Sequence, residues 1–124
     1  MATSGKQILV IEADPVLRDL MKLGLERAGF AVQSSGTAQE AQSLITPSSP
    51  DLILIDMTLP GEAELAFISG LKRSENPHPA PVIVISALGY REVIAQAIQA
   101  GAGDFFVKPF HIDELIRRVQ RWLR

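Results

Sequence analysis

Apolar residues fall into five short runs, separated by longer stretches in which apolar residues recur at helical spacing. Four runs are continuous rather than alternating, which is typical of strands covered on both faces in a parallel sheet. The continuous runs are Ile8–Ile11, Leu52–Ile55, Val82–Ile85 and Phe105–Val107, and the fifth is the pair Ala31 and Val32. The pattern therefore predicts five strands.

The stretches between and after these runs predict five helices. Asp14 is the expected N-cap of the first helix, with Pro15 at its first position and Gly29 at its end. Thr37 and Glu40 form the spacing of a capping box at the start of the second. Residues expected to face the core are Leu17, Leu20, Met21, Gly24 and Ala28; Ala41, Leu44 and Ile45; Leu65, Ile68 and Leu71; Val93, Ile94, Ala97 and Ile98; and Ile112, Leu115, Ile116 and Val119.

Strands that alternate with helices predict right-handed crossovers and a parallel sheet with helices on both faces. The expected fold class is therefore α/β, a three-layer (βα)5 sandwich. Two proline-rich segments, Thr46–Pro50 and Glu75–Pro81, are short enough to be loops between a helix and the next strand. We therefore expect residues 1–124 to form a single domain.

Composition narrows the class of protein further. Hydrophobic residues make up 47% of the 124 residues and charged residues 21%, which is typical of a globular domain. The net charge of -2 gives no general attraction to nucleic acid, and the arginines of the last helix are expected to form a solvated face. The sequence has no cysteines, no apolar run long enough to span a membrane, and no signal-peptide pattern. We therefore expect the protein to be located in the cytoplasm.

Four reactive side chains follow directly after predicted strands. Glu12 follows the first strand, Asp56 the third, Ser86 the fourth and Lys108 the fifth. Open α/β sheets bind ligands outside the carboxyl ends of their strands, so these groups are expected to meet in one crevice. Two acids, a hydroxyl and an ammonium group suit phosphoryl chemistry, in which a carboxylate attacks phosphorus and a cation offsets charge on the transferred oxygens.

Four sequence segments carry a resemblance to the receiver domains of bacterial response regulators. They are ILVIEADP, DLILIDMTLPG, VIVISA and AGAGDFFVKPF, and their order and spacing match that family over nearly the whole chain. The resemblance implies a flavodoxin-like parallel sheet of five strands in the order 2-1-3-4-5. It also implies a switch that is controlled by phosphorylation in two-component signalling.

The resemblance assigns a role to each reactive residue. Asp56 would accept a phosphoryl group from a phosphohistidine on a sensor histidine kinase or a histidine phosphotransfer protein. Lys108 would pair with Asp56 or with a phosphoryl oxygen, and the bond from Lys108 to Pro109 would be cis. Ser86 would move its hydroxyl to the phosphoryl group, and Phe105 would either follow it inward as a switch residue or simply pack in the core.

The resemblance also implies a magnesium ion held by Glu12, Asp56 and the backbone carbonyl of Met57. Receivers normally carry a second acid directly after the first, where this chain has Ala13. Losing that carboxylate should weaken magnesium binding without abolishing it, because magnesium retains several waters. Glu12 could reach further, Asp14 could turn inward as a further candidate ligand, or the domain could work without phosphorylation.

A second departure follows the segment LPG. Relatives commonly have an acid and then a glycine there, where this chain has Ala63 and Glu64. We expect this difference to alter the turn into the third helix and not the chemistry of the site.

The alternative function is a pseudo-receiver that docks protein partners without phosphorylation. In either case the surface expected to engage a downstream protein or an output domain is formed by the fourth helix, the fifth strand and the fifth helix, with a homodimer as a further candidate. We expect no enzyme activity beyond assistance to its own phosphoryl transfer and dephosphorylation, and no direct contact with nucleic acid or membrane. A phosphohydrolase of the haloacid dehalogenase type is disfavoured, because it needs an acid where this chain has Thr58.

Overall fold

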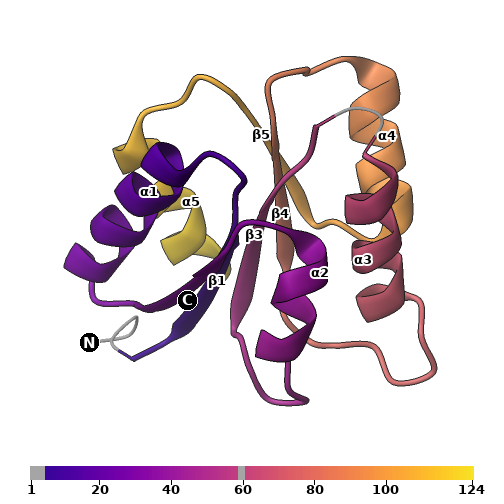
Figure 1. Ribbon diagram of the computed structural model, residues 1–124, viewed down its shortest axis with the longest axis horizontal. Helices are drawn as coiled ribbons and strands as arrows, with labels where there is room; N and C mark the ends of the chain where they lie inside the picture. The colour runs from indigo at the N-terminus through magenta and orange to yellow at the C-terminus, as the bar shows by residue number, and fades with distance from the viewer. Residues whose placement is uncertain (1–4, 59–60) are drawn as a thin grey trace.

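The computed structural model describes residues 5–58 and 61–124. Five parallel strands form one sheet in the order β2-β1-β3-β4-β5, as the resemblance implied (Figure 1). The strands are β1 Gln7–Ile11, β2 Ala31–Ser35, β3 Leu52–Asp56, β4 Val82–Ser86 and β5 Asp104–Val107. The helices are α1 Pro15–Arg27, α2 Ala38–Ala41, α3 Glu62–Lys72, α4 Arg91–Ala100 and α5 Ile112–Trp122, with a short 3-10 turn η1 at Gln42–Leu44.

Helices cover both faces of the sheet and create two hydrophobic cores. Helices α1 and α5 lie on one side, whereas α2, α3 and α4 lie on the other (Figure 1). Alternate residues of the central strands enter opposite cores, because successive side chains of a strand point to opposite faces. Leu54 packs in the core with Met21 and Leu115, and Ile55 packs in the other core with Ile68 and Ala97. The predicted three-layer sandwich is confirmed.

Three sequence expectations about burial were wrong. Ile98, expected on the inner face of the fourth helix, is 46% exposed, and the buried residues of α4 are Val93, Ala97 and Ala100. Leu20, placed on the inner face of the first helix, is 56% exposed, and the buried residues there are Met21 and Leu25. The run Phe105–Val107 was expected to be covered on both faces, but Val107 is 46% exposed. Because β5 is the edge strand of the sheet, it lacks a neighbour on one side and is less completely covered than β3 and β4.

The predicted helix boundaries have a clear local cause. The Asp14 carboxylate accepts a hydrogen bond from the Val16 N–H at 2.9 Å, and Pro15 occupies the first position of α1. The Thr37 hydroxyl accepts from the Glu40 N–H at 3.1 Å, but α2 continues for only four residues before the 3-10 turn. No helix within residues 5–58 and 61–124 is long and apolar enough to cross a membrane.

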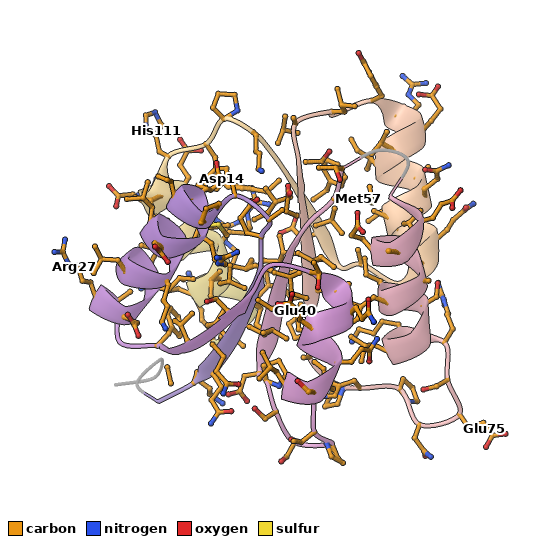
Figure 2. The ribbon with its side chains drawn as sticks, in the orientation of Figure 1. Asp14, Arg27, Glu40, Met57, Glu75 and His111 are labelled. Carbon is orange, nitrogen blue, oxygen red and sulfur yellow. The ribbon has the colours of Figure 1, made fainter. Side chains whose placement is uncertain are left out.

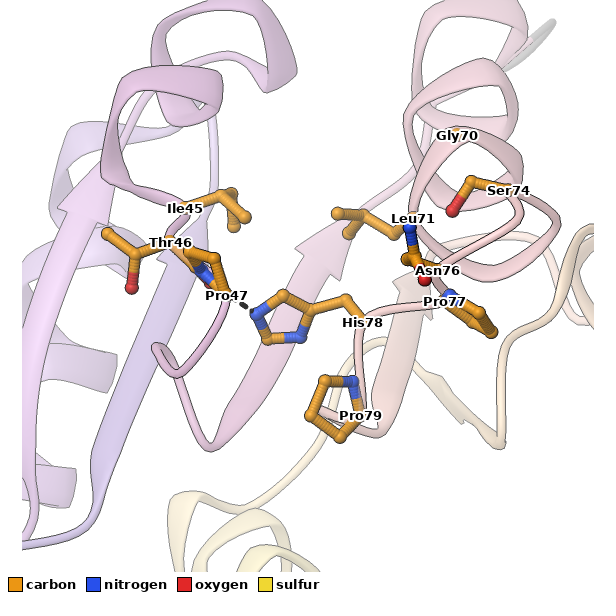
Figure 3. A pocket seen from close by; sticks show the side chains of 10 residues that line it. All are labelled: Ile45, Thr46, Pro47, Gly70, Leu71, Ser74, Asn76, Pro77, His78 and Pro79. Atoms are coloured by element: carbon orange, nitrogen blue, oxygen red, sulfur yellow. Dashed lines mark hydrogen bonds between the residues drawn. The ribbon is translucent and has the colours of Figure 1, made fainter.

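His78 joins the two proline-rich loops at the end of the sheet opposite the strand ends that carry the reactive residues. Its ring accepts a hydrogen bond from the Ala80 N–H at 3.1 Å through Nδ1, so Nε2 donates to the Thr46 carbonyl oxygen at 2.8 Å. The ring points from one loop toward the other across a hollow of about 490 Å³ (Figure 3). Sequence analysis gave this histidine no role, since a single histidine in a loop has no spacing pattern that reveals its partners.

Asp104 fastens the last helix to the edge strand. Its carboxylate accepts hydrogen bonds from Arg118 at 2.8 and 2.9 Å and from the Trp122 Nε1–H at 2.9 Å. Burial by itself would raise the pKa of Asp104. The hydrogen bonds from Trp122, Arg118 and the Phe105 N–H, with the charge of Arg118, instead lower this pKa below its ordinary value.

The substitution Asp104→Asn should therefore destabilise the fold in a pH-dependent way. At pH 7 we expect the free energy of unfolding to fall by about 1–2 kcal/mol, since the charged hydrogen bonds are partly exposed. A lowered folded-state pKa gives stability above the unfolded value of about 4, and this stability is lost as pH falls through the folded value. Urea unfolding followed by circular dichroism should show the difference in stability between the wild type and Asp104→Asn becoming smaller in acid. Asp113→Asn, at an exposed site of α5, should be as stable as the wild type at both pH values.

Candidate functional site

Parallel strands bring the predicted reactive residues to one rim of the sheet. In the sheet register Ile11 lies beside Ile55, Asp56 beside Ile85 and Ser86 beside Val107. Glu12 and Lys108 each directly follow one of these strand-end residues, so all four reactive residues emerge at the same level. Asp14 and Met57, neighbours of the site, lie toward one end of the molecule and Glu75 toward the other (Figure 2).

Lys108 joins the two acids. Its Nζ atom lies 2.8 Å from Asp56 Oδ1 and 3.0 Å from Glu12 Oε1. The side chain of Asp56 is 7% exposed and that of Glu12 is 2% exposed, so the ammonium group offsets two carboxylates that have little contact with water. Burial by itself would lower the pKa of Lys108, but its hydrogen bonds to Asp56 and Glu12 and their charges raise it above its ordinary value. The lysine therefore stays protonated at neutral pH.

Glu12 is held from three directions. Besides the bond from Lys108, its Oε2 atom accepts a hydrogen bond from the Asp14 N–H at 3.1 Å. Its backbone carbonyl oxygen accepts one from Arg18 Nη1 at 3.0 Å. Sequence analysis missed Arg18, because its position on a helix gave no sign that its side chain reaches back to the preceding strand end. These bonds fix both the backbone and the side chain of Glu12 beside Asp56.

Ser86 is the last residue of β4, and Phe105 lies in the neighbouring strand β5. The Ser86 side chain is buried, and its Oγ atom accepts a hydrogen bond from the Leu88 N–H at 3.1 Å. Phe105 is partly buried and packs against the core under α2, α3 and α4. The Lys108–Pro109 peptide bond is cis, as the resemblance implied. The hydroxyl of Ser86 thus ties the site to the loop that leads to α4.

A groove of about 370 Å³ opens beside Asp56. It runs between the ends of β1, β2 and β3 and the starts of α2 and α3. Its lining includes Ala13, Thr37, Gln39, Asp56, Thr58 and Glu64. Sequence analysis assigned Glu64 to the turn and not to the chemistry, but its position on the wall of this groove makes it part of the surroundings of Asp56. No strand-end signal could have identified Glu64, because it belongs to a helix.

The oxygen atoms of the site suit a hard divalent cation. Glu12 and Asp56 supply two carboxylates, which is within the one or two that magnesium commonly uses together with retained waters. The structure places Asp14 differently from the other predicted ligands, since its exposed carboxylate caps α1. Across residues 5–58 and 61–124, no three acidic or histidine side chains are grouped closely enough to hold an ion together. A metal ion at Asp56 would thus keep much of its water shell.

Sequence comparison matches residues 8–120 to the family model of the response regulator receiver domain. The DNA-binding dual master transcriptional regulator RpaA of Synechocystis sp. is 36% identical over 118 residues, which cover 95% of this chain and 49% of that protein. The chain spans about half the length of the curated relatives it matches.

Solved structures give the same result. A response regulator from Thermotoga maritima superimposes with a TM-score of 0.84 at 29% identity, covering 96% of this chain and 98% of that one. The receiver domain of the sensor histidine kinase PA1611 from Pseudomonas aeruginosa gives 0.81 at 29% identity, with 97% and 98% covered. That structure has a magnesium ion coordinated in its active site cleft.

Proposed function

Because this chain belongs to the response regulator receiver domain family, we propose that Asp56 accepts a phosphoryl group from a phosphohistidine on a sensor histidine kinase or a histidine phosphotransfer protein. Membership gives the general role, which is phosphoacceptance in two-component signalling. The observation that carries the residue assignment is the Lys108 ammonium group, which contacts Asp56 and Glu12 at one rim of the sheet. The alternative of a phosphorylation-independent pseudo-receiver is not favoured.

The chemistry needs one nucleophile and nearby positive charge. An oxygen of Asp56 forms a bond to phosphorus while the bond from phosphorus to the donor histidine breaks, and the imidazole nitrogen keeps the electron pair and takes up a proton. Lys108, whose Nζ lies 2.8 Å from Asp56 Oδ1, would offset the charge on the transferred phosphoryl oxygens. Magnesium, held by Glu12, Asp56 and the Met57 carbonyl, would offset further negative charge on the same oxygens.

Phosphorylation would shift the domain between two conformations. A ligand biases such an equilibrium only through contacts that differ between the two states. The Ser86 oxygen, which accepts a hydrogen bond from the Leu88 N–H, can turn so that its O–H donates to a phosphoryl oxygen; this movement breaks the bond from Leu88 and releases the loop before α4. Phe105 then gains room to pack further inward. This exchange links the bound phosphate to the surface formed by α4, β5 and α5.

The α4–β5–α5 surface is the proposed docking site for a downstream protein, an output domain or a second copy. Four large apolar side chains of these elements are exposed: Tyr90, the N-cap of α4, at 61%, Ile98 and Val107 at 46% each, and Trp122 of α5 at 40%. Exposed apolar residues from adjoining elements are typical of protein interaction sites. We propose that residues 1–124 form a single receiver domain that works in the cytoplasm and acts on proteins through this surface. We propose no direct contact with DNA or membrane, and no enzyme activity on other substrates.

Intact-mass spectrometry tests the assignment of Asp56. The chain is incubated with acetyl phosphate, with and without magnesium. We expect one added phosphoryl group with magnesium, far less without it, and none in Asp56→Asn. Asp51→Asn, whose carboxylate accepts from the Gln7 N–H at the other end of the sheet, should be labelled like the wild type.

Two results would contradict the proposal. Equal labelling of Asp56→Asn and wild type would place the acceptor elsewhere. A folded wild type that accepts no phosphoryl group from either acetyl phosphate or a phosphorylated phosphotransfer protein would favour the pseudo-receiver.

A further inference from the structure

Glu64 is a carboxylate beside Asp56 that the proposed function leaves without a task. It lies in the first turn of α3, lines the groove with Asp56 and Ala13, and is partly buried. Within the described parts of the chain it forms no ion pair and no side-chain hydrogen bond. Glu62, two residues earlier in the same turn, is exposed and does not line the groove. The two glutamates therefore differ in what their charges can reach.

Asp56 independently offers an oxygen atom to a ligand in this groove. Its side chain is only 7% exposed, and one oxygen atom is paired with Lys108 at 2.8 Å. No hydrogen bond from residues 5–58 or 61–124 reaches its other oxygen atom. Every fully buried side-chain oxygen of these residues has a hydrogen-bond partner, so this oxygen atom cannot be fully buried. The second oxygen therefore faces the groove, where water or a cation must satisfy it.

Ala13 lies on the same groove as Glu64. Its methyl group can neither ligate a cation nor hold a metal-bound water. A carboxylate on another wall can contribute through water, because magnesium keeps several waters when it binds to a protein. Since the acidic and histidine side chains of the described ranges form no group of three around one point, Glu64 suits a contact through water better than direct ligation.

We propose that the Glu64 carboxylate accepts a hydrogen bond from a water bound to the cation at Asp56, and so supplies the acidic contribution that Ala13 cannot make. Glu64 is thus a positioning residue for the hydrated ion, acting from the α3 part of the groove lining. This inference rests on the proposed function, since it takes the cation to be the magnesium ion that assists phosphoryl transfer. It makes a separate claim about binding, which can be measured without phosphorylation.

Magnesium affinity of the full unphosphorylated chain tests this role. Titration with magnesium chloride, followed by the amide resonances of Met57 and Thr58, gives the dissociation constant. Removing a group that holds a metal's outer shell typically weakens binding 10- to 100-fold, so we expect Glu64→Gln to weaken it about tenfold. Glu62→Gln removes the same charge from the same turn and should change the magnesium dissociation constant by less than about twofold at 0.15 M salt. Equal effects of the two substitutions, or no magnesium binding by the wild type, would overturn the inference.

A double substitution tests whether Glu64 replaces an acid at position 13. Ala13→Asp alone should tighten magnesium binding. In that background Glu64→Gln should weaken magnesium binding by about threefold or less, because the effects of two groups that act on the same ion are not additive. Fully additive effects of the two substitutions would contradict the claim that Glu64 takes the place of an acid at position 13. If Asp56 is phosphorylated but the two glutamates behave alike, only this inference fails; if Glu64 selectively holds magnesium but Asp56 accepts no phosphate, only the proposed function fails.

Discussion

Replacing Lys108 by methionine is expected to lower the free energy of unfolding by about 3 kcal/mol at pH 7 without divalent cations, because it leaves two poorly hydrated carboxylates without their shared cation. The carboxylates are those of Asp56 and Glu12, at 2.8 and 3.0 Å from the lysine Nζ. The value is at the low end for breaking a buried pair, since the lysine side chain is 22% exposed. Methionine retains most of the apolar stem, so the loss reports mainly the missing charge.

Urea unfolding in the presence of a chelator measures this effect. Lys6→Met, at an exposed site, is the matched control and should stay within about 0.5 kcal/mol of the wild type. Added magnesium should recover more stability in Lys108→Met than in the wild type, because the ion then binds two unpaired carboxylates of the folded state. Equal stability of the two lysine variants would mean that the bridge between Asp56 and Glu12 contributes nothing to the fold.

The largest loss of stability is expected from Leu54→Ala, at about 3–5 kcal/mol, because a fully buried leucine side chain leaves a cavity when truncated. Leu54 is 0% exposed in the central strand β3, between Val10 of β1 and Ile83 of β4. Rigid strands on both sides limit how far the core can collapse into the vacated space. Chemical unfolding monitored by circular dichroism gives the difference directly.

Leu20→Ala provides the comparison, since it removes the same atoms from a side chain that is 56% exposed. We expect it to change stability by no more than about 0.5 kcal/mol. A loss similar to that of Leu54→Ala would mean that α1 turns its Leu20 side inward, as the helical spacing alone predicted, and would contradict the packing described above.

Helix faces show where a repeating pattern stops being decisive. Leu17, Leu20 and Met21 fit one inner face equally well by spacing, but the sheet covers only part of α1, so Met21 is buried and Leu20 is exposed. The apolar run Phe105–Val107 resembles the apolar runs of β3 and β4 in sequence, yet its strand lies at the edge of the sheet and is less covered. Burial in these cases depends on which neighbours exist, and local sequence does not contain that information.

The candidate site divides in the same way. Glu12, Asp56, Ser86 and Lys108 could be predicted because each follows an apolar run, and parallel strands end at a common rim. Glu64 could not, because a helix starts beyond a loop and its direction over the groove depends on packing. Arg18 and His78 were missed because each acts through a hydrogen bond to a backbone carbonyl oxygen outside its own element, Arg18 to Glu12 just before α1 and His78 to Thr46 in the other proline-rich loop.

The sequence by itself determined the five strands, the five helical segments, and which reactive groups stand at the strand ends. Those features depend on periodicity and order along the chain, which are local properties. Only the tertiary structure decided which carboxylates Lys108 joins, which wall of the groove Glu64 occupies, and which apolar side chains stay exposed. Each of these depends on contacts between segments far apart in sequence, and such contacts form only when the whole sheet and both helical layers are assembled.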